Sequence, residues 1–334
     1  MGLITPYFKV LADSQDITQA IKKRLVSLTV KDESGLKSDT AEIILDDRGN
    51  DVALPRTGAE LTIYLGYKEE SLALMGVYIV DEITLSGPPE TMAIRAKAAN
   101  MRQSLKATKI RTWQKEGTTP EKIKLVDIVK KIAQEHGLDP KISGAFSGID
   151  YDVINQVDES DINLLTRLAR DLGGIAKPTP GLLVFAERGA AKSVSGQNLA
   201  EITLVQKDVT SYQVTFQERG KFSTVSARYH DQDAAKTVDV TVGQGEPVYS
   251  LRKVFNAASD ALNAAAAKLA DYQRGTATVS VTAPGDPRLL AETKLTLSGF
   301  RDGYAGPWIV KDATHTISGA GYTMNINAES KKGA

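Results

Sequence analysis

Alternation of apolar and polar residues runs through the first hundred positions and predicts β-strands. It covers residues 25–31, 41–45, 61–65, 74–85 and 90–98, with turns rich in Gly, Pro and Asp between them. Many short strands without a long helix are typical of a small closed barrel or a sandwich. Because closure removes exposed strand edges, we predict a β-barrel domain over residues 1–108.

A helical period replaces this alternation in the next part of the chain. Thr119 can cap a first helix, and Pro120 can take its first position. A second helix is predicted to begin at Ser160, before a hairpin that turns at residues 178–181. We therefore predict an α+β module over residues 109–188.

The last part of the chain returns to the strand pattern. A small, polar linker over residues 190–200 leads to predicted strands over 209–217 and 223–229. A helix is predicted over residues 257–273, with Ala at most of its apolar positions. Because alanine is small, this helix should lie close against another backbone. We predict that residues 189–334 form a second β-barrel domain that includes this helix.

The two β regions contain matching sequences in the same order. The matches pair residues 61–63 with 295–297, 66–67 with 299–300, 78–81 with 308–311, 86–87 with 318–319, and 91–96 with 323–328. Self-similarity at this separation indicates a duplicated β domain rather than a short-period repeat. We expect Tyr78, Trp308, Tyr67 and Phe300 to pack inside the barrels, and Arg288 is a further position of interest. Three copies of a chain with two equivalent domains would present six quasi-equivalent units.

Composition excludes several classes of protein. The chain has 334 residues, enough for two or three domains. Lys plus Arg and Asp plus Glu each number 41, so the formal net charge is zero, which argues against a general nucleic-acid binder. The absence of cysteine excludes disulfides, thiolate metal sites and cysteine nucleophiles. No stretch approaches the roughly 20 apolar residues of a membrane span, and the first ten residues lack the apolar core of a secretory signal.

Candidate catalytic groups are scattered along the sequence. His136, His230 and His315 stand alone, without the spacing of metal ligands or of a general base. The acidic pairs are mostly in turns or at a helix start, where Asp and Glu are favoured for local reasons: Asp46-Asp47, Glu69-Glu70, Asp158-Glu159, and Asp231 with Asp233. We predict that the chain has no catalytic residue, no cofactor and no metal site.

Two alternative functions stay open at this point. A cell-wall hydrolase would need paired carboxylates or a metal site, for which Asp231 and Asp233 with His230 are the candidates. A peptidoglycan-binding module is the other, because residues 109–140 are faintly similar to a lysin motif, with a strand, a helix and a His-Gly-Leu end.

Several segments together resemble the late control gene D protein family, the baseplate hub of contractile phage tails. The central match runs from Ser160-Asp161 through Leu164-Leu165-Thr166-Arg167-Leu168-Ala169 and is followed by a Gly-Leu-Leu-Val-Phe hairpin at 181–185. A second match includes the Ala-rich helix, Asp286-Pro287-Arg288-Leu289 and the strand from Trp308 to Ile317. The resemblance covers essentially the whole chain.

The resemblance implies two related β-barrels with an α+β insertion and a non-enzymatic structural role. Three copies would form a ring that adapts the sixfold tail tube to a threefold central spike. The implied partners are therefore the chain itself as a homotrimer, the spike and the tube, with the tape-measure protein and the baseplate wedge as further candidates. We expect synthesis in the bacterial host cytoplasm and a final place in the tail baseplate, or in a contractile bacteriocin. The type VI secretion version continues into a long spike, so we expect the spike here to be a separate protein.

Overall fold

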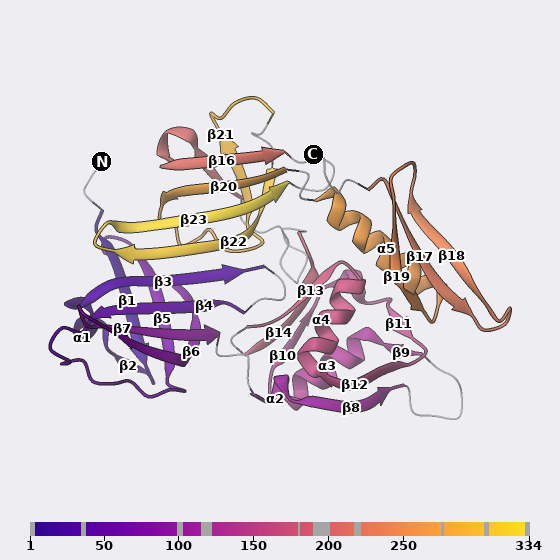
Figure 1. Cartoon of the computed structure of the whole chain (residues 1–334), viewed down its shortest axis with the longest axis horizontal. Coiled ribbons are helices and arrows are strands. Elements are labelled where there is room, and N and C mark those ends of the chain that lie inside the picture. The colour runs from indigo at the N-terminus through magenta and orange to yellow at the C-terminus, as the bar shows by residue number, and fades with distance from the viewer. Residues whose placement is uncertain are drawn as a thin grey trace.

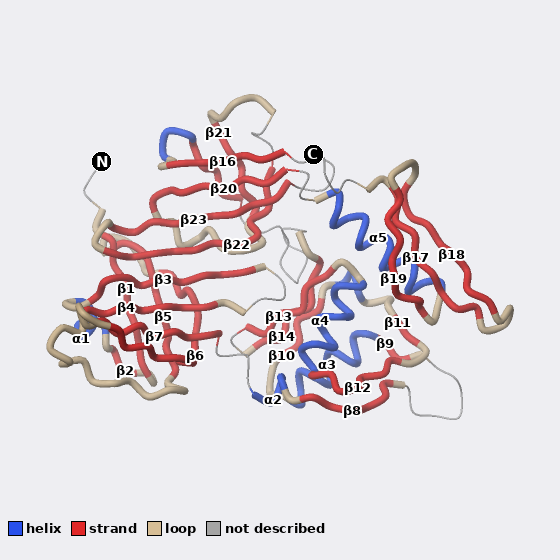
Figure 2. Tube along the Cα trace, viewed as in Figure 1, coloured by secondary structure: helices blue, strands red, loops and turns tan. Residues whose placement is uncertain are grey.

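The computed structural model describes residues 4–34, 38–98, 103–114, 122–179, 181–189, 201–216, 222–274, 277–303 and 307–330. Figure 1 shows a large sheet on one side and the smaller mixed elements on the other, and Figure 2 shows that strands predominate. The fold is thus mainly β, as predicted. Among these residues no helix is long and apolar enough to cross a membrane.

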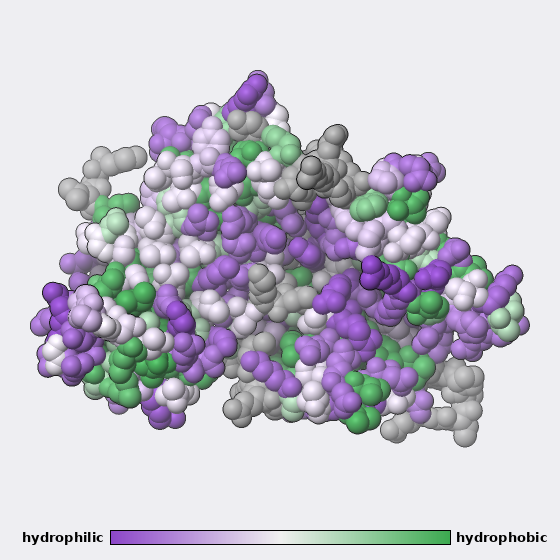
Figure 3. All heavy atoms as spheres, in the orientation of Figure 1, coloured by the Kyte–Doolittle hydropathy of each residue, from purple (hydrophilic) through white to green (hydrophobic). Residues whose placement is uncertain are grey.

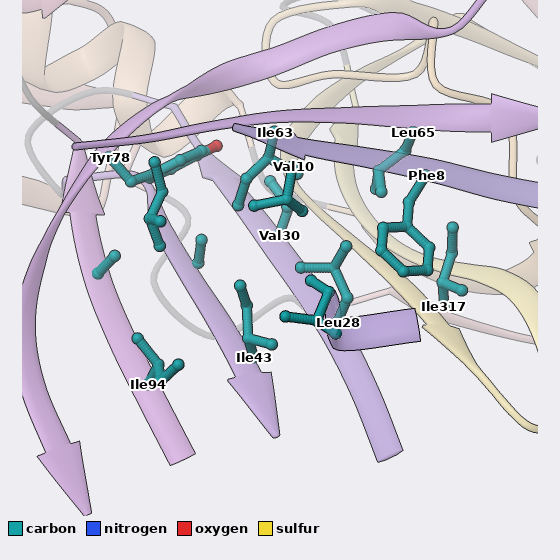
Figure 4. Close-up of a cluster of buried hydrophobic side chains, with 14 of the residues drawn as sticks. Phe8, Val10, Leu28, Val30, Ile43, Ile63, Leu65, Tyr78, Ile94 and Ile317 are labelled. Atoms are coloured by element: carbon teal, nitrogen blue, oxygen red, sulfur yellow. The ribbon is translucent and has the colours of Figure 1, made fainter. Parts of the chain in front are cut away.

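Residues up to 98 form the strands of the first half, together with the short helix α1 (Thr18–Lys22). The strands are β1 (Pro6–Ala12), β2 (Gln15–Asp16), β3 (Leu25–Glu33), β4 (Thr40–Asp46), β5 (Glu60–Tyr67), β6 (Ala73–Ser86) and β7 (Thr91–Ala98). Alternate residues of β4 and β5 are buried, which is the pattern that the sequence predicted. The inward side chains form one apolar core, part of which Figure 4 shows around Val30, Ile43 and Ile63.

The second half of the sheet is built from two segments, residues 201–216 and 277–330. Its elements are β15 (Glu201–Val205), the 3-10 helix η2 (Gln206–Asp208), β16 (Ser211–Phe216), β20 (Ala277–Pro284), β21 (Lys294–Ser298), β22 (Pro307–Ser318) and β23 (Gly321–Ser330). β15 runs parallel to β21, and the other neighbouring strands are antiparallel. Their inward side chains form a second core, which includes Val281, Leu295 and Ile326.

The two halves belong to one 13-stranded sheet, because β22 pairs with β3. Among the described residues, no strand pairing closes either half into a ring, so the expected closed barrel differs from the observed sheet. The reason lies in β3, whose outer edge is occupied by β22 and is therefore not available to β1. Ile317 of β22 packs into the core of the first half beside Leu28 (Figure 4).

The matching sequences occupy matching positions in the sheet. Leu61 lies opposite Tyr78 in the first half, and Leu295 lies opposite Trp308 in the second. The repeated Ser-Gly pair is an exception, because Ser86 lies opposite Thr91 directly, whereas Ser318 lies opposite Gly321. The β22–β23 hairpin is therefore longer than the β6–β7 hairpin.

Residues 103–187 form a separate α+β module with its own core. Its elements are α2 (Gln103–Lys106), β8 (Thr108–Trp113), β9 (Ile123–Lys124), α3 (Leu125–Glu135), β10 (Asp139–Ile142), the 3-10 helix η1 (Gly144–Phe146), β11 (Asp150–Tyr151), β12 (Ile154–Ser160), α4 (Asp161–Asp171), β13 (Gly174–Thr179) and β14 (Leu182–Glu187). The predicted hairpin is β13–β14, and Ser160 caps α4 by accepting the Asn163 amide hydrogen.

The helix that the sequence predicted to start at Thr119 begins later in the structure. Thr119 and Pro120, its expected cap and first residue, lie outside the described residues. The helix α3 starts at Leu125, because Ile123 and Lys124 pair with β11 and keep the chain extended up to that point.

A further unit joins the three strands β17 (Thr224–Asp231), β18 (Lys236–Gly243) and β19 (Val248–Phe255) with the helix α5 (Ala258–Gln273). The prediction placed residues 223–229 in the second barrel domain, whereas they form the central strand of this small sheet. Helix α5 covers that sheet, and its buried alanines allow a close approach to the end of α4. A Cβ added at Gly173 would lie 3.3 Å from Cβ of Ala267, so the predicted close packing of the Ala-rich helix is confirmed.

Candidate functional site

The junction between the two halves of the sheet contains a buried polar network. His315 of β22 is fully buried, and its Nε2 lies 2.9 Å from the Leu289 carbonyl oxygen. Its Nδ1 lies 3.0 Å from the Tyr322 hydroxyl. Because a carbonyl can only accept, Nε2 carries the proton and Nδ1 accepts from the tyrosine. Burial lowers the pKa of His315, so the ring is neutral at pH 7, in agreement with these two hydrogen bonds.

The repeated aromatic residues are also structural. Tyr78 and Trp308 are buried at equivalent positions, and Phe300 is buried in the second core. Tyr67 is buried against Tyr322, and its hydroxyl donates to the carbonyl oxygen of Gly285 at 2.9 Å. These four side chains therefore pack within the sheet, as expected.

Arg288, by contrast, is exposed on the surface. Its guanidinium donates to the carboxylate of Asp286 with distances of 2.6 Å and 2.9 Å. This pair orders the loop that leads from β20 to β21. An exposed pair of this kind contributes little to stability.

An ion cluster connects the insertion module to both halves of the sheet. Lys177 of β13 lies 2.8 Å from a carboxylate oxygen of Asp32 and 2.8 Å from one of Asp39. The other carboxylate oxygen of Asp32 accepts the amide hydrogen of Ala291, from the second half, at 2.8 Å. One cation thus faces two carboxylates where the three parts of the chain meet.

Burial and the neighbouring Asp32 raise the pKa of Asp39 to about 6, even though Lys177 acts in the opposite direction. A carboxyl whose pKa is raised on folding binds its proton more tightly in the folded chain than in the unfolded chain. Lowering the pH from 7 towards 4 should therefore stabilise the wild-type chain relative to Asp39→Asn. Urea unfolding of both proteins at several pH values measures this difference. A difference that stays constant over this range would contradict the raised pKa.

A second ion cluster lies inside the insertion module, around the first residue of α4. Asp161 is fully buried and accepts hydrogen bonds from Lys109 Nζ at 2.6 Å and from Gln156 Nε2 at 2.9 Å. It also pairs with Arg111, and its carboxylate lies 2.8 Å from Nε2 of His136. The Arg111 guanidinium in turn stacks 4.1 Å from the centre of the Trp113 ring.

Glu135, His136 and Asp161 present ligand atoms within 4.8 Å of one another, a spacing at which they could hold a metal ion. The donors nearby argue against a metal here. Lys109 reaches both carboxylates, at 3.1 Å from Glu135 and 2.6 Å from Asp161, and a metal ion would have to displace it. Burial alone would raise the pKa of Asp161, but hydrogen bonds from Gln156, His136 and Lys109 outweigh it and hold the pKa at about 2. The cluster is best explained as an ion-pair network that fixes β8, α3 and α4 together.

The remaining acidic candidates have local roles. The carboxylate of Asp231 accepts backbone amide hydrogens of Asp233 and Ala234 in the β17–β18 turn, at 3.1 Å and 3.0 Å. Asp47 accepts from Val52 in the same way. The other pairs also make structural contacts: Asp46 pairs with Arg48, Glu69 accepts the Thr5 amide hydrogen, and Glu159 pairs with Arg167. In each pair at least one carboxylate is thus engaged with a backbone amide or a guanidinium, which disfavours the hydrolase.

The segment 109–140 depends on residues outside it. Its strand β8 pairs with β12, and its strand β10 pairs with β14. The core around α3 is completed by side chains of α4. A lysin-motif module would have to fold by itself, so this arrangement disfavours the peptidoglycan-binding alternative.

A groove of about 220 Å³ separates α4 from β19 and α5. Lys253 and Asp171 form a 2.7 Å ion pair beside it, and the Lys253 ammonium lies 4.4 Å from the centre of the Phe255 ring. Burial raises the pKa of Tyr151, which also lines the groove. The groove marks the contact between the insertion module and the outer unit.

Sequence reasoning did not find the Lys177 cluster or the Asp161 cluster. Asp161 lay in the quoted family motif, but Lys109 and Arg111 are about fifty positions away and carry no local signal. The alternation of Lys109, Arg111 and Trp113 on one face of β8 is the pattern that could have indicated an inward charged face.

Comparison with known proteins identifies the family. The model of the phage tail baseplate hub (GPD) family matches residues 93–321. The chain is 29% identical to a probable baseplate hub protein of Escherichia phage P2, over 98% of this chain and 93% of the relative. It is 30% identical to a probable baseplate hub protein of Escherichia phage 186, over 98% and 94%.

Solved structures agree on the fold. The 43 kDa tail protein of prophage MuSo2 from Shewanella oneidensis superimposes with a TM-score of 0.70 at 16% identity, covering 96% of this chain and 97% of that one. An Escherichia coli component of the type VI secretion system gives a TM-score of 0.57 at 9% identity, covering 91% of this chain and 73% of that one. The family-model match and the sequence relatives show that the chain belongs to the phage tail baseplate hub family.

Proposed function

We propose that the chain is a non-enzymatic adaptor that forms a homotrimeric ring in the tail baseplate. The observation that carries this proposal is the duplicated strand ladder, in which β5, β6 and β7 correspond to β21, β22 and β23. Two equivalent units in each chain give six in a trimer. Such a ring can match a sixfold tube on one face and a threefold spike on the other. In this proposal residues 1–108 and 189–334 supply the ring, and residues 109–188 form the insertion.

The partners that we propose are those that the family resemblance implies. They are the tail tube, the central spike, and more peripherally the tape-measure protein and the baseplate wedge. The balanced charge of the chain fits assembly, because subunits with no net charge repel each other little. Synthesis in the host cytoplasm and assembly into the tail are part of the same proposal.

The native mass tests the trimer. Light scattering of the purified chain, alone and mixed with the spike protein of the same tail, should give a mass of three copies in at least one condition. A monomer in both conditions would contradict the ring. A chain that lacks residues 1–108 should not form the trimer, because it has lost one of the two equivalent units. A truncated chain that still formed a trimer would show that the duplication is not what builds the ring.

A further inference from the structure

We propose that neighbouring copies join by antiparallel pairing of β6 from one chain with β16 from the next. This pairing would repeat, between chains, the β22–β3 pairing that joins the two halves within one chain. The inference rests on the proposed ring and adds to it the strands, the register and the residues that make the contact.

Both strands have an edge without a strand neighbour among the described residues. After Val80, β6 pairs with β7 on one side, while β5 on the other side has ended. Strand β16 pairs with β20 on one side only and stands at the end of the 13-stranded sheet. Exposed strand edges of this kind are ready templates for pairing with another chain.

The free part of β6 corresponds to the part of β22 that pairs with β3. Both strands have a bulge at the same place, between Val80 and Glu82 and between Val310 and Asp312. The backbone hydrogen bonds before the bulge also match. The Val80 amide donates to the carbonyl oxygen of Ala59 at 2.9 Å, and the Val310 amide donates to that of Thr293 at 3.0 Å. Glu82 is therefore the counterpart of Asp312, where pairing with β3 begins.

Strand β16 corresponds in the same way to β3. The cross-strand paths that establish this run through Leu28, Ile43 and Ile94 in the first half, and through Tyr212, Val281 and Ile326 in the second. Ile94 and Ile326 occupy the same place in the repeated sequence. Tyr212 is therefore the counterpart of Leu28, and β16 has the free edge that β3 uses to bind β22.

The internal junction then fixes the register between copies. Within the chain, Thr316 lies opposite Thr29, His315 opposite Val30, and Thr314 opposite Lys31. Transferred to the counterparts, this register gives the following pairs between copies: Ser86 with Gln213, Leu85 with Val214, Thr84 with Thr215, and Ile83 with Phe216.

Exposure supports this register. Leu85 is 60% exposed, although its counterpart His315 is 0% exposed. Tyr212 is 40% exposed, although its counterpart Leu28 is 0% exposed. Phe216 lies four residues after Tyr212, on the same face of β16, and is 62% exposed. Apolar side chains are thus exposed where the internal junction buries its own.

A second copy of this chain is the occupant that fits these edges. The β6 edge and the β16 edge differ, so each copy would use one edge on each neighbour, which is the head-to-tail arrangement that builds rings. Figure 1 places the two edges on opposite sides of the β22–β3 junction. Figure 3 shows hydrophobic residues gathered on the surface over β2, β6 and β7, near the first of these edges.

Engineered disulfides test the register, because the natural chain has no cysteine. The double variant Ser86→Cys with Gln213→Cys should form covalent multimers of the full chain on mild oxidation, ending at a ring of three. Directly opposite residues of an antiparallel pair have Cα atoms about 4.5–5.5 Å apart, within the range of a disulfide. The positive control is Thr29→Cys with Thr316→Cys, whose hydroxyl oxygens lie 3.2 Å apart and should yield a disulfide within one chain.

The mismatched control is Ser86→Cys with Thr215→Cys, which shifts the contact by two residues along the same face and should cross-link at least tenfold less. Equal cross-linking of matched and mismatched pairs would overturn the register. A trimer by native mass that gives no cross-link with the matched pair would overturn the strand pairing and leave the trimer standing. A monomer without cross-links would overturn both.

A surface variant tests the same contact without oxidation. Leu85→Asp should dissociate the multimer, because it places a charge at the centre of the proposed junction. Leu74→Asp is the matched control, since Leu74 is 50% exposed on the same strand but outside the junction. Circular dichroism should show that both variants keep the fold. Retention of the full native mass by Leu85→Asp would count against the proposal.

Discussion

Replacing Asp161 with alanine is expected to destabilise the insertion module by about 3 kcal/mol at neutral pH. The carboxylate is fully buried, and it neutralises Lys109 and Arg111, which are 31% and 23% exposed. Without it, two cations would face each other at the edge of the core with only Glu135 between them. The loss should be largest above pH 4, because the folded pKa of about 2 lies below the ordinary value and the stabilisation fades as the pH falls through it.

Asp127→Ala is the matched control for this substitution. Asp127 also lies in the first turn of a helix of the same module, but it is exposed, so its loss should change stability by less than about 0.5 kcal/mol. Urea unfolding followed by Trp113 fluorescence reports on the module, since Trp113 is buried beside Gln156 and Arg111. Equal midpoints for the two variants would contradict the structural role of the Asp161 network.

The sequence predicted those parts of the fold that depend on local patterns. Strand alternation, the cap at Ser160 and the β13–β14 hairpin each depend on neighbours within a few residues, and each appears in the structure. The duplication could also be predicted, because identical ladder positions such as Tyr78 and Trp308 keep similar residues. The start of helix α3 was predicted too early, because the pairing of β9 with β11 is not local.

The arrangement of the strands into one sheet could not be predicted. It depends on β22 binding to β3 across nearly three hundred positions, and a strand of alternating residues carries no sign of which partner takes its edge. The same reason explains why the outer unit of β17, β18 and β19 was assigned to the second barrel. A strand pattern defines which face is buried but not which sheet the strand joins.

The polar clusters were missed for a related reason. Each of them combines residues from distant elements, such as Lys177 with Asp32 and Asp39, and each member alone resembles an ordinary surface charge. The family resemblance, in contrast, did identify the function class, because several weak motifs in a fixed order are specific together. It gave no information on which residues connect the parts of the chain.

Replacing Lys177 with methionine is expected to cost about 3 kcal/mol at pH 7, since methionine fills a similar volume but leaves two buried carboxylates without their cation. Lys177 is 18% exposed, and Asp32 and Asp39 are 15% and 19% exposed. In the wild-type chain, burial would raise the pKa of Asp32, but the Lys177 ammonium outweighs it and the pKa is lowered. Without it, burial and mutual repulsion would raise the pKa of both acids, so the variant should recover part of its stability as the pH falls from 7 to 5.

The second substitution Asp39→Asn should restore part of the loss in Lys177→Met, because it removes one of the two unpaired charges. Lys141→Met is the matched control, since Lys141 pairs with Asp139 on the surface of the same module and is 49% exposed. Hydrogen exchange shows which contact fails: the amide of Ala291, which donates to Asp32, should lose protection together with β13. Loss of protection in β13 alone would mean that the cluster connects the insertion to the first half only. Loss in both would mean that one lysine connects the insertion to both halves of the sheet.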